Sequence, residues 1–590
     1  MKLQFSEVLG RAQKVITSYP LTLLAAGIMT IAAIYLIESD YTSEDTNYFV
    51  TKIMIVASLG ISVSFGLKML SQRNPKFSWL ELLLLPFLIG YYFILPAKWF
   101  DFTEVYTFLL IPSYLLAHLL VAIIPYLKKE NTENDFWEYN KKLFVNFFLT
   151  LIFTGVLCAG VELAIVAVDN LFNMDFQGDI YFETFIFFLI FGSCFIFLLF
   201  SIGGLDALEK KAEFPVVLKF FTQFILIPLL ICYALILYLY TLKIIINWEL
   251  PRGWVSYLVL AYSMLGILAL LLVFPLKDET EKSWVRLFSK IFYYSLFPLL
   301  ILLFVAIFTR VLEYGFTEAR YFVLLLAVWL TLITFYFVFY KRATIKFIPV
   351  SLFLFGFFAL VFPFLNAFSV AKYSQKKDLM RILTENNLLK DGKINFNQEV
   401  DYETVEAIED KFEFLDERHQ TAYLYELLPD DFTKPKQNKR YRYWNLYREF
   451  SKVNKTAQVI ETDSDQIRLT NSESVFETAG YDYFVQPNRF NSDYKDLKIG
   501  EDILNIIQTN QSFKLKLNNK ESVDLTPQIK ELFKNKRPSF DDYETDDLSI
   551  VSQLGNYRIK IIFSSINLTQ SNKKDSFYFQ PATLLIKKTD

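Results

Sequence analysis

Apolar stretches of about 17 to 30 residues recur through the first 370 positions of the chain, most of them bounded by charge or proline. A hydrocarbon core roughly 30 Å thick needs about 20 apolar residues of helix to cross it, because backbone polar groups cannot stay unpaired in lipid. The pattern therefore predicts an α-helical polytopic membrane bundle of about 11 transmembrane helices over residues 1–370. The predicted spans are Leu21–Ile37, Tyr48–Leu70, Trp79–Leu95, Val105–Leu127, Leu143–Val168, Tyr181–Ile202, Val217–Ile246, Trp254–Leu276, Ile291–Thr309, Tyr321–Tyr340 and Phe347–Phe368.

The loops between these spans fall into two sets that differ in basic residues. Loops on the side of the N-terminus contain most of the lysines and arginines, whereas the alternate loops contain few and are acidic at Glu38, Asp40, Glu44 and Asp45. Short cytoplasmic loops are enriched in Lys and Arg. The N-terminus is therefore predicted to be cytoplasmic, and an odd number of spans puts everything after Phe368 on the far side.

Residues 371–430 change character and predict a helical extramembrane segment. The chain becomes rich in Lys, Asp, Glu, Asn and Tyr, and Tyr373–Leu388 has the pattern of an amphipathic helix that ends before a turn at 390–392. A second helix is predicted because four apolar residues recur on one helical face. These are Val405, Ile408, Phe412 and Leu415.

Residues 431–590 favour strands and predict a soluble periplasmic α+β domain with an antiparallel sheet. Phe513, Leu515 and Leu517 alternate with polar residues, which is the period of a half-buried strand. Tyr557–Phe563 and Ser576–Lys587 are rich in β-branched and aromatic residues. The predicted fold is thus a membrane bundle with a C-terminal soluble α+β domain.

The positions of the cysteines help to predict the cellular compartment of the chain. The three cysteines, Cys158, Cys194 and Cys232, all lie inside predicted spans, so the tail contains none and cannot use disulfides. An exported domain without disulfides is acceptable in a bacterial periplasm and less usual on a eukaryotic cell surface. The predicted location is the bacterial inner (cytoplasmic) membrane, with the lipid bilayer as the first partner.

Several classes of chemistry are disfavoured by missing motifs. With two histidines the chain has no His-x-x-x-His helix, and it has no Cys-x-x-Cys pair, so no metal site is predicted. It also lacks the phosphate-binding Gly-rich motifs and Gly-x-Ser-x-Gly. We therefore predict no cofactor and disfavour an ATP-driven pump or a serine hydrolase. The formal charge of −3 and the absence of a dense basic run give no support for nucleic-acid binding.

Ionisable residues within predicted spans are costly and need a physical reason. His118 lies near the middle of the fourth span and Glu162 in the outer part of the fifth. Their depths differ by about 15 Å along the helix axes, which is too far for a direct proton relay. We expect His118 to donate to a neighbouring helix and Glu162 to pair with a backbone donor or an arginine near the outer surface.

The outer interface contains the most specific candidate site. Arginines on outer loops oppose the positive-inside bias, so they call for an explanation. One explanation is an interfacial anchor with salt bridges to Glu249, Glu313 and Glu318; the other is a basic pocket for an anionic headgroup, polymer or partner. The candidate residues are Glu162, Asp169, Glu249, Arg252, Arg310, Glu318 and Arg320.

The same loops carry a family resemblance. Trp248–Ser256 and Tyr314–Tyr321, the latter running into Leu324–Trp329, resemble bacterial multi-spanning membrane proteins catalogued as domain of unknown function 4153. The segment Leu388–Lys393 is similar as well. The resemblance implies a bacterial, Bacteroidota-type inner membrane protein without an established activity, and no catalytic residues can be carried over.

Three classes of function remain open. The first is an envelope interaction or assembly protein that binds a protein partner through its C-terminal domain. The second is a transporter or channel for a small or lipidic solute, which requires a path through the bundle. The third is a membrane enzyme acting on an envelope lipid or polymer, with Glu162, Asp169, Glu318 and the three arginines as candidate residues.

Overall fold

A computed structural model describes residues 5–589, except 39–42, 128–131, 175, 177, 212–215, 248–253, 279–282, 399, 430–431, 433–445, 447–449, 451–464, 472–477, 486–496, 510–511, 535–541, 544–547 and 571–575. The chain divides into two compact units, Met1–Lys455 and Thr456–Asp590. Each unit is described by itself below.

The first unit contains the predicted membrane bundle. Among the described residues, 10 helices are long and apolar enough to cross a membrane. The helices and short 3₁₀ or π segments (η) are α1 Phe5–Ser18, α2 Pro20–Glu38, α3 Glu44–Arg73, η1 Pro75–Leu83, α4 Leu84–Ile94, η2 Trp99–Asp101, α5 Val105–Ile123, η3 Ile124–Tyr126, α6 Glu133–Phe172, α7 Asp179–Phe187, η4 Phe188–Gly192, α8 Ser193–Phe200, α9 Gly204–Glu209, α10 Val216–Phe220, η5 Phe221–Leu226, α11 Ile227–Asn247, α12 Trp254–Leu272, η6 Phe274–Asp278, α13 Ser283–Tyr314, α14 Glu318–Phe339 and α15 Phe347–Val361. The polytopic bundle is therefore confirmed.

The eleventh predicted span, Phe347–Phe368, is shorter than expected. Helix α15 has 15 residues and ends at Val361. Pro363 has no N–H to continue a helix and holds the preceding Phe362 in an extended conformation (φ −68°, ψ 123°). The next helix, α16, spans Ala367–Glu385. Asn366 caps its N-terminus, because the Asn366 side chain accepts a hydrogen bond from the backbone N–H of Ser369.

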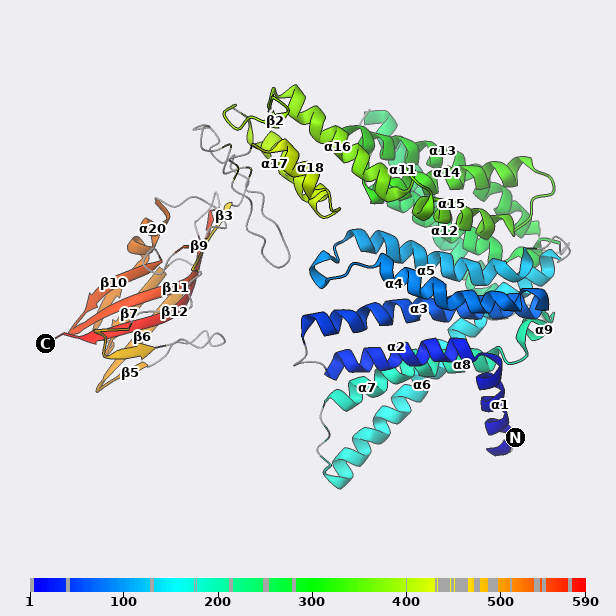
Figure 1. Cartoon of the computed structure of the whole chain (residues 1–590), viewed down its shortest axis with the longest axis horizontal. Helices are drawn as coiled ribbons and strands as arrows, with labels where there is room; N and C mark the ends of the chain where they lie inside the picture. Colours follow the sequence, from blue (N-terminus) through cyan, green and yellow to red (C-terminus); the bar gives the residue numbers. More distant parts are fainter. Residues whose placement is uncertain are drawn as a thin grey trace. The chain divides into compact units, whose positions relative to one another are not determined.

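We call residues 367–428 the cap segment; they form a small helical layer at the end of the bundle away from the N-terminus (Figure 1). Its elements are α16, β1 Leu389–Lys390, β2 Lys393–Ile394, α17 Tyr402–Asp416 and α18 Thr421–Leu427. Asp391 and Gly392 have left-handed backbone (φ 52° and 79°) and close the β1–β2 hairpin. The predicted apolar face of α17 is confirmed, because its four residues are all buried in the core of the cap segment.

The second unit is an α+β fold with its own hydrophobic core. Its elements are β3 Asp465–Asn471, β4 Tyr483–Val485, β5 Leu497–Ile499, β6 Asp502–Thr509, β7 Ser512–Leu517, β8 Glu521–Asp524, α20 Thr526–Lys534, β9 Asp542–Tyr543, β10 Ser549–Leu554, β11 Tyr557–Gln570 and β12 Ser576–Lys588. One sheet has the order β4-β12-β11-β3-β9 with β10 also on β11, and the other has β5-β6-β7-β8. All described pairs are antiparallel except β3–β9, which is parallel. Phe513, Leu515 and Leu517 all face the core, as the alternation in β7 predicts.

Candidate functional site: an apolar chamber under a helical cap

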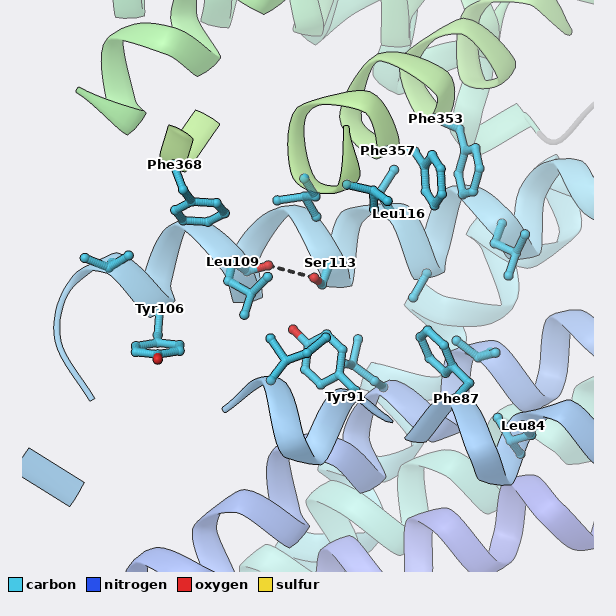
Figure 2. A pocket seen from close by; sticks show the side chains of 18 of the residues that line it. Leu84, Phe87, Tyr91, Tyr106, Leu109, Ser113, Leu116, Phe353, Phe357 and Phe368 are labelled. Carbon is cyan, nitrogen blue, oxygen red and sulfur yellow. Dashed lines mark hydrogen bonds between the residues drawn. The ribbon is translucent and has the colours of Figure 1, made fainter. Parts of the chain in front are cut away.

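A cavity of about 690 Å³, called the chamber below, lies among α3, η1, α4, α5 and α15 (Figure 2). Its volume falls within the roughly 300–1,000 Å³ of small-molecule sites. Most of its lining is apolar. The lining residues are Leu59, Val63, Leu67, Leu80, Leu83, Leu84, Phe87, Tyr91, Ile94, Val105, Tyr106, Leu109, Ser113, Leu116, Ala117, Leu120, Phe353, Phe357, Leu360, Val361, Phe368, Lys372, Glu417, Arg418 and His419.

One face of α5 forms a long wall of the chamber. Lining residues recur along this helix at the three- and four-residue spacing of a single helical face, from Val105 to Leu120. This wall is about 22 Å long, at about 1.5 Å per residue. On the facing helix α4, Leu84, Phe87 and Tyr91 form the opposite wall, and Figure 2 shows the two walls facing each other across the cavity.

The cap segment supplies the charged end of the chamber. Phe368 and Lys372 come from α16, and the turn after α17 supplies Glu417, Arg418 and His419. Burial raises the pKa of Glu417; Arg418 opposes this shift, while Glu104 and Glu413 add to it. Lys372 has no ion-pair partner within the described part of the chain. The chamber thus combines a hydrocarbon lining with a polar end at which a lysine is available.

A buried ion pair fixes this charged end to the bundle, and we call it the latch. Arg418 donates from Nε and Nη2 to Oε1 and Oε2 of Glu318 at the start of α14, both at 2.8 Å. Glu318 is 0% exposed and Arg418 is 9% exposed. The Arg418 guanidinium also lies 3.3 Å from the centroid of the Phe414 ring. Such a bidentate pair is specific in geometry, and Glu318 alone would be a buried, uncompensated charge. Arg418 also pairs with Glu417, from Nη1 to Oε2 at 3.3 Å.

The loop between α13 and α14 also binds α16. Gln375 Nε2 donates to the carbonyls of Tyr314 and Phe316 at 3.0 and 2.8 Å, and the N–H of Phe316 donates to Ser374 Oγ at 2.8 Å. Gly315 between them has φ 72°, and an added Cβ would lie 3.0 Å from Ser374 and Gln375. The left-handed backbone at this position favours glycine, and the close approach adds to that preference. The cap segment is therefore docked on the bundle by backbone recognition as well as by the latch.

Asp378 joins the two long helices of the cap segment. Its Oδ2 is 2.9 Å from Lys411 Nζ on α17, and its Oδ1 accepts from Arg381 Nε at 3.1 Å. Burial by itself would raise the pKa of Asp378, but the hydrogen bonds and charges of Lys411 and Arg381 outweigh burial and lower it. The carboxylate is thus held ionised between α16 and α17.

Three side chains with hydroxyl groups, Tyr91, Tyr106 and Ser113, interrupt the apolar lining of the chamber. Ser113 Oγ donates to Leu109 O at 2.7 Å, as drawn in Figure 2. The Tyr91 hydroxyl points into the space between α4 and α5 and is buried without a hydrogen-bond partner among the described residues. The Ser113 hydroxyl lies close to the Tyr91 hydroxyl, although no hydrogen bond of ordinary geometry joins the two side chains.

The sequence profile described as "Domain of unknown function (DUF4153)" matches residues 23–410 of the chain. The chain belongs to this family. The DUF4153 region covers the chamber walls, the Glu318 half of the latch and most of the cap segment, so the predicted resemblance is confirmed. An uncharacterized protein of Pasteurella multocida (strain Pm70) is 32% identical over 220 residues. The alignment covers 37% of each chain, so this chain spans little more than a third of that relative. No solved structure matches the chain.

The structure of this DUF4153 protein brings three of the predicted site residues to one region. Glu318 forms the latch. Arg310 and Arg320 lie over the ring of Tyr314, at 5.7 and 5.3 Å from its centroid, and Arg320 donates to the carbonyls of Tyr314 and Gly315. The Arg310–Glu313 pair is exposed at 3.9 Å. Arg320 thus stabilises the loop that binds α16.

The other predicted residues do not join this group. Asp169 accepts from the Phe176 N–H and the Tyr181 hydroxyl, at 3.0 and 3.2 Å. Glu162, on the same helix α6, has a buried oxygen without a hydrogen-bond partner among the described residues, so the arginine or backbone donor expected for it is not found there. Expected to donate to another helix, His118 instead contacts Tyr114 O of its own helix through Nδ1 at 2.8 Å. Glu249 and Arg252 lie outside the described residues.

Sequence reasoning missed Arg418, Asp378 and Tyr91. Arg418 and Asp378 are charged residues in a soluble helical segment, where charged side chains are expected to lie on the solvated surface. Tyr91 lies in an apolar run, where the sequence does not distinguish it from the other aromatic side chains of the span. The local pattern does not reveal that Arg418 pairs with Glu318 or that Asp378 pairs with Lys411, because these partners are distant in the sequence.

Proposed function

We propose that this DUF4153 protein binds a lipidic solute in the chamber, with the cap segment covering the solute's polar end. This corresponds to the transporter-like class of function. The observation that carries the proposal is the chamber itself, an apolar cavity that has a charged end. A membrane protein whose role were only to anchor a partner domain would not need such a cavity.

The dimensions of the chamber agree with an acyl chain. Half of a roughly 30 Å hydrocarbon core is about 15 Å, which is the depth that the tails of one leaflet fill. The α5 wall extends over about 22 Å from the cap end. A lipid tail entering at the cap end would therefore meet apolar side chains over its whole length, while its headgroup stays near Lys372.

The proposed orientation puts the N-terminus in the cytoplasm and the cap segment, with residues 431–590, in the periplasm of a bacterial inner membrane. The excess of Lys and Arg in the loops on the side of the N-terminus supports this orientation. The chamber would then open towards the outer leaflet, and the latch would lie at the periplasmic surface.

A matched pair of variants tests the proposal. Leu109 lines the chamber, whereas Ile111 lies on the same helix, outside the lining and 65% exposed. Full-length protein with Leu109→Trp, with Ile111→Trp or without a substitution is purified in a mild detergent, and bound lipids are counted by native mass spectrometry. We expect Leu109→Trp to retain several-fold fewer lipids and Ile111→Trp to match the unsubstituted protein. Equal retention by all three would contradict the proposal.

A second candidate function is envelope assembly through a protein partner. It is favoured by the second unit, whose described residues form a hydrophobic core of their own. Crosslinking in native membranes would compare the full chain with a version ending at Lys455, which retains the whole first unit. A partner captured by the full chain and lost on truncation supports this function, and identical captured sets argue against it.

A further inference from the structure

We propose that helix α1 binds the surface of the bilayer, with its apolar side inserted among the lipids of an anionic leaflet. This leaflet is the one at the basic end of the bundle, where the loops carry most of its lysines and arginines. No residue of α1 lines the chamber, so the proposal is independent of lipid binding there.

Helix α1 has an apolar side and a charged side. Apolar residues recur along it at the three- and four-residue intervals of one helical side, and charged residues recur at the same intervals on another. This division is typical of helices that lie in the plane of a membrane. The apolar side comprises Val8, Leu9, Ala12 and Ile16, and the charged side comprises Glu7, Arg11 and Lys14.

The bundle buries little of α1. Val15 near its end and Tyr19 just after it belong to a buried core cluster. By contrast, Val8, Leu9 and Ile16 are 50%, 60% and 56% exposed. Exposing a row of apolar side chains to water costs free energy. A surface outside the described part of the chain therefore covers the apolar side.

The connection to α2 puts the bilayer next to this side. Tyr19 alone separates α1 from α2, which is long and apolar enough to cross a membrane. Pro20 has no N–H with which to continue α1. The chain changes direction there, and Figure 1 shows α1 running across the direction of α2 at one end of the bundle. A helix that joins a membrane-spanning helix in this way lies along the membrane surface.

The charges of α1 favour anionic lipids. Arg11 and Lys14 outnumber Glu7, and the Arg11–Glu7 pair is exposed, with Nη2 and Oε1 3.0 Å apart. Basic residues beside a membrane attract anionic headgroups. A second copy of the chain would present the same excess of positive charge and gain no such attraction. The occupant that fits both sides of α1 is therefore a lipid surface.

Hydrogen exchange in nanodiscs tests the proposal. A helix of 14 residues is marginal in water, so the amides of its first turns exchange slowly only if the apolar side is held. Full-length protein is reconstituted into nanodiscs of phosphatidylcholine mixed with phosphatidylglycerol. We expect Leu9→Gln to speed exchange of α1 amides several-fold, because Gln and Leu have similar helix propensity and only the apolar side changes. Gln13→Ala, outside the apolar side, should not speed it.

The charge of the lipid is tested separately. Lys14→Gln should speed exchange several-fold at low salt in nanodiscs that contain phosphatidylglycerol, and have no effect in phosphatidylcholine alone. Equal effects in the two lipids would overturn the choice of an anionic leaflet.

Three results would overturn bilayer binding itself. One is fast exchange of α1 in the unsubstituted protein in both kinds of nanodisc. Another is slow exchange that Leu9→Gln leaves unchanged, or that requires two copies of the chain in one nanodisc. The third is a fall in the melting temperature of Leu9→Gln, which would mean that this exposed side chain packs on the protein. We expect the melting temperature to stay the same.

Discussion

At the scale of single residues, the latch shows why an unpaired charge costs more free energy when it is buried. Removing one partner of a buried pair leaves the other uncompensated, whereas replacing both by apolar side chains is often neutral. We predict that Arg418→Met destabilises the cap by about 3–5 kcal/mol, and that adding Glu318→Leu restores most of the loss. Thermal unfolding of the purified variants measures both effects. If the double variant is less stable than Arg418→Met, the buried-charge explanation is wrong.

Also at this scale, Lys372 is the cation offered to the ligand. We predict that Lys372→Gln weakens binding of a phosphatidylglycerol probe several-fold at low salt, and that the difference shrinks at high salt because the interaction is electrostatic. Arg381→Gln, which removes a cation on the same helix outside the lining, should have little effect. Native mass spectrometry or a spin-labelled probe would measure the change. A salt-independent loss would indicate altered packing instead.

At the scale of elements, α16 and α17 are held together by Asp378. Because its pKa is lowered in the folded protein, its contribution to stability is present above about pH 3.8, the ordinary value, and is lost as pH falls through the folded value. We predict that Asp378→Asn exposes α17 amides to faster hydrogen exchange at pH 7 and that the difference from the unsubstituted protein vanishes in acid. Glu385→Gln is the control, since this partner of Arg381 is 60% exposed and such surface pairs contribute little.

At the scale of the whole molecule, the two units have separate cores. The division after Lys455 keeps the cap segment with the bundle, so the chamber and the latch belong to one folding unit. We predict that a chain ending at Lys455 retains the lipids of the full chain in native mass spectrometry. Residues 456–590 expressed alone should show the cooperative unfolding of a β-rich domain. Loss of chamber lipids on this truncation would mean that the second unit contributes to the site.

Local periodicity was enough to predict most elements of the fold. Ten of the eleven predicted spans appear as long apolar helices, because apolar runs in lipid have no alternative to helix. The buried face of α17 and the alternation of β7 followed from periods of 3.6 and 2. The eleventh span was overestimated because hydropathy does not register the break at Pro363. Among the candidate site residues, the anchor interpretation paired Glu318 with the outer-loop arginines, whereas the structure pairs it with Arg418 from the cap segment.

The sequence by itself thus determined that the chain belongs in a bilayer, where its helices run, and that a soluble α+β region follows them. These properties depend on the order and period of neighbouring residues. The tertiary structure alone decided that Glu318 meets Arg418 and that the faces of α4 and α5 enclose a chamber. Such pairings depend on how whole helices pack. No local pattern encodes the partner of a side chain a hundred residues away.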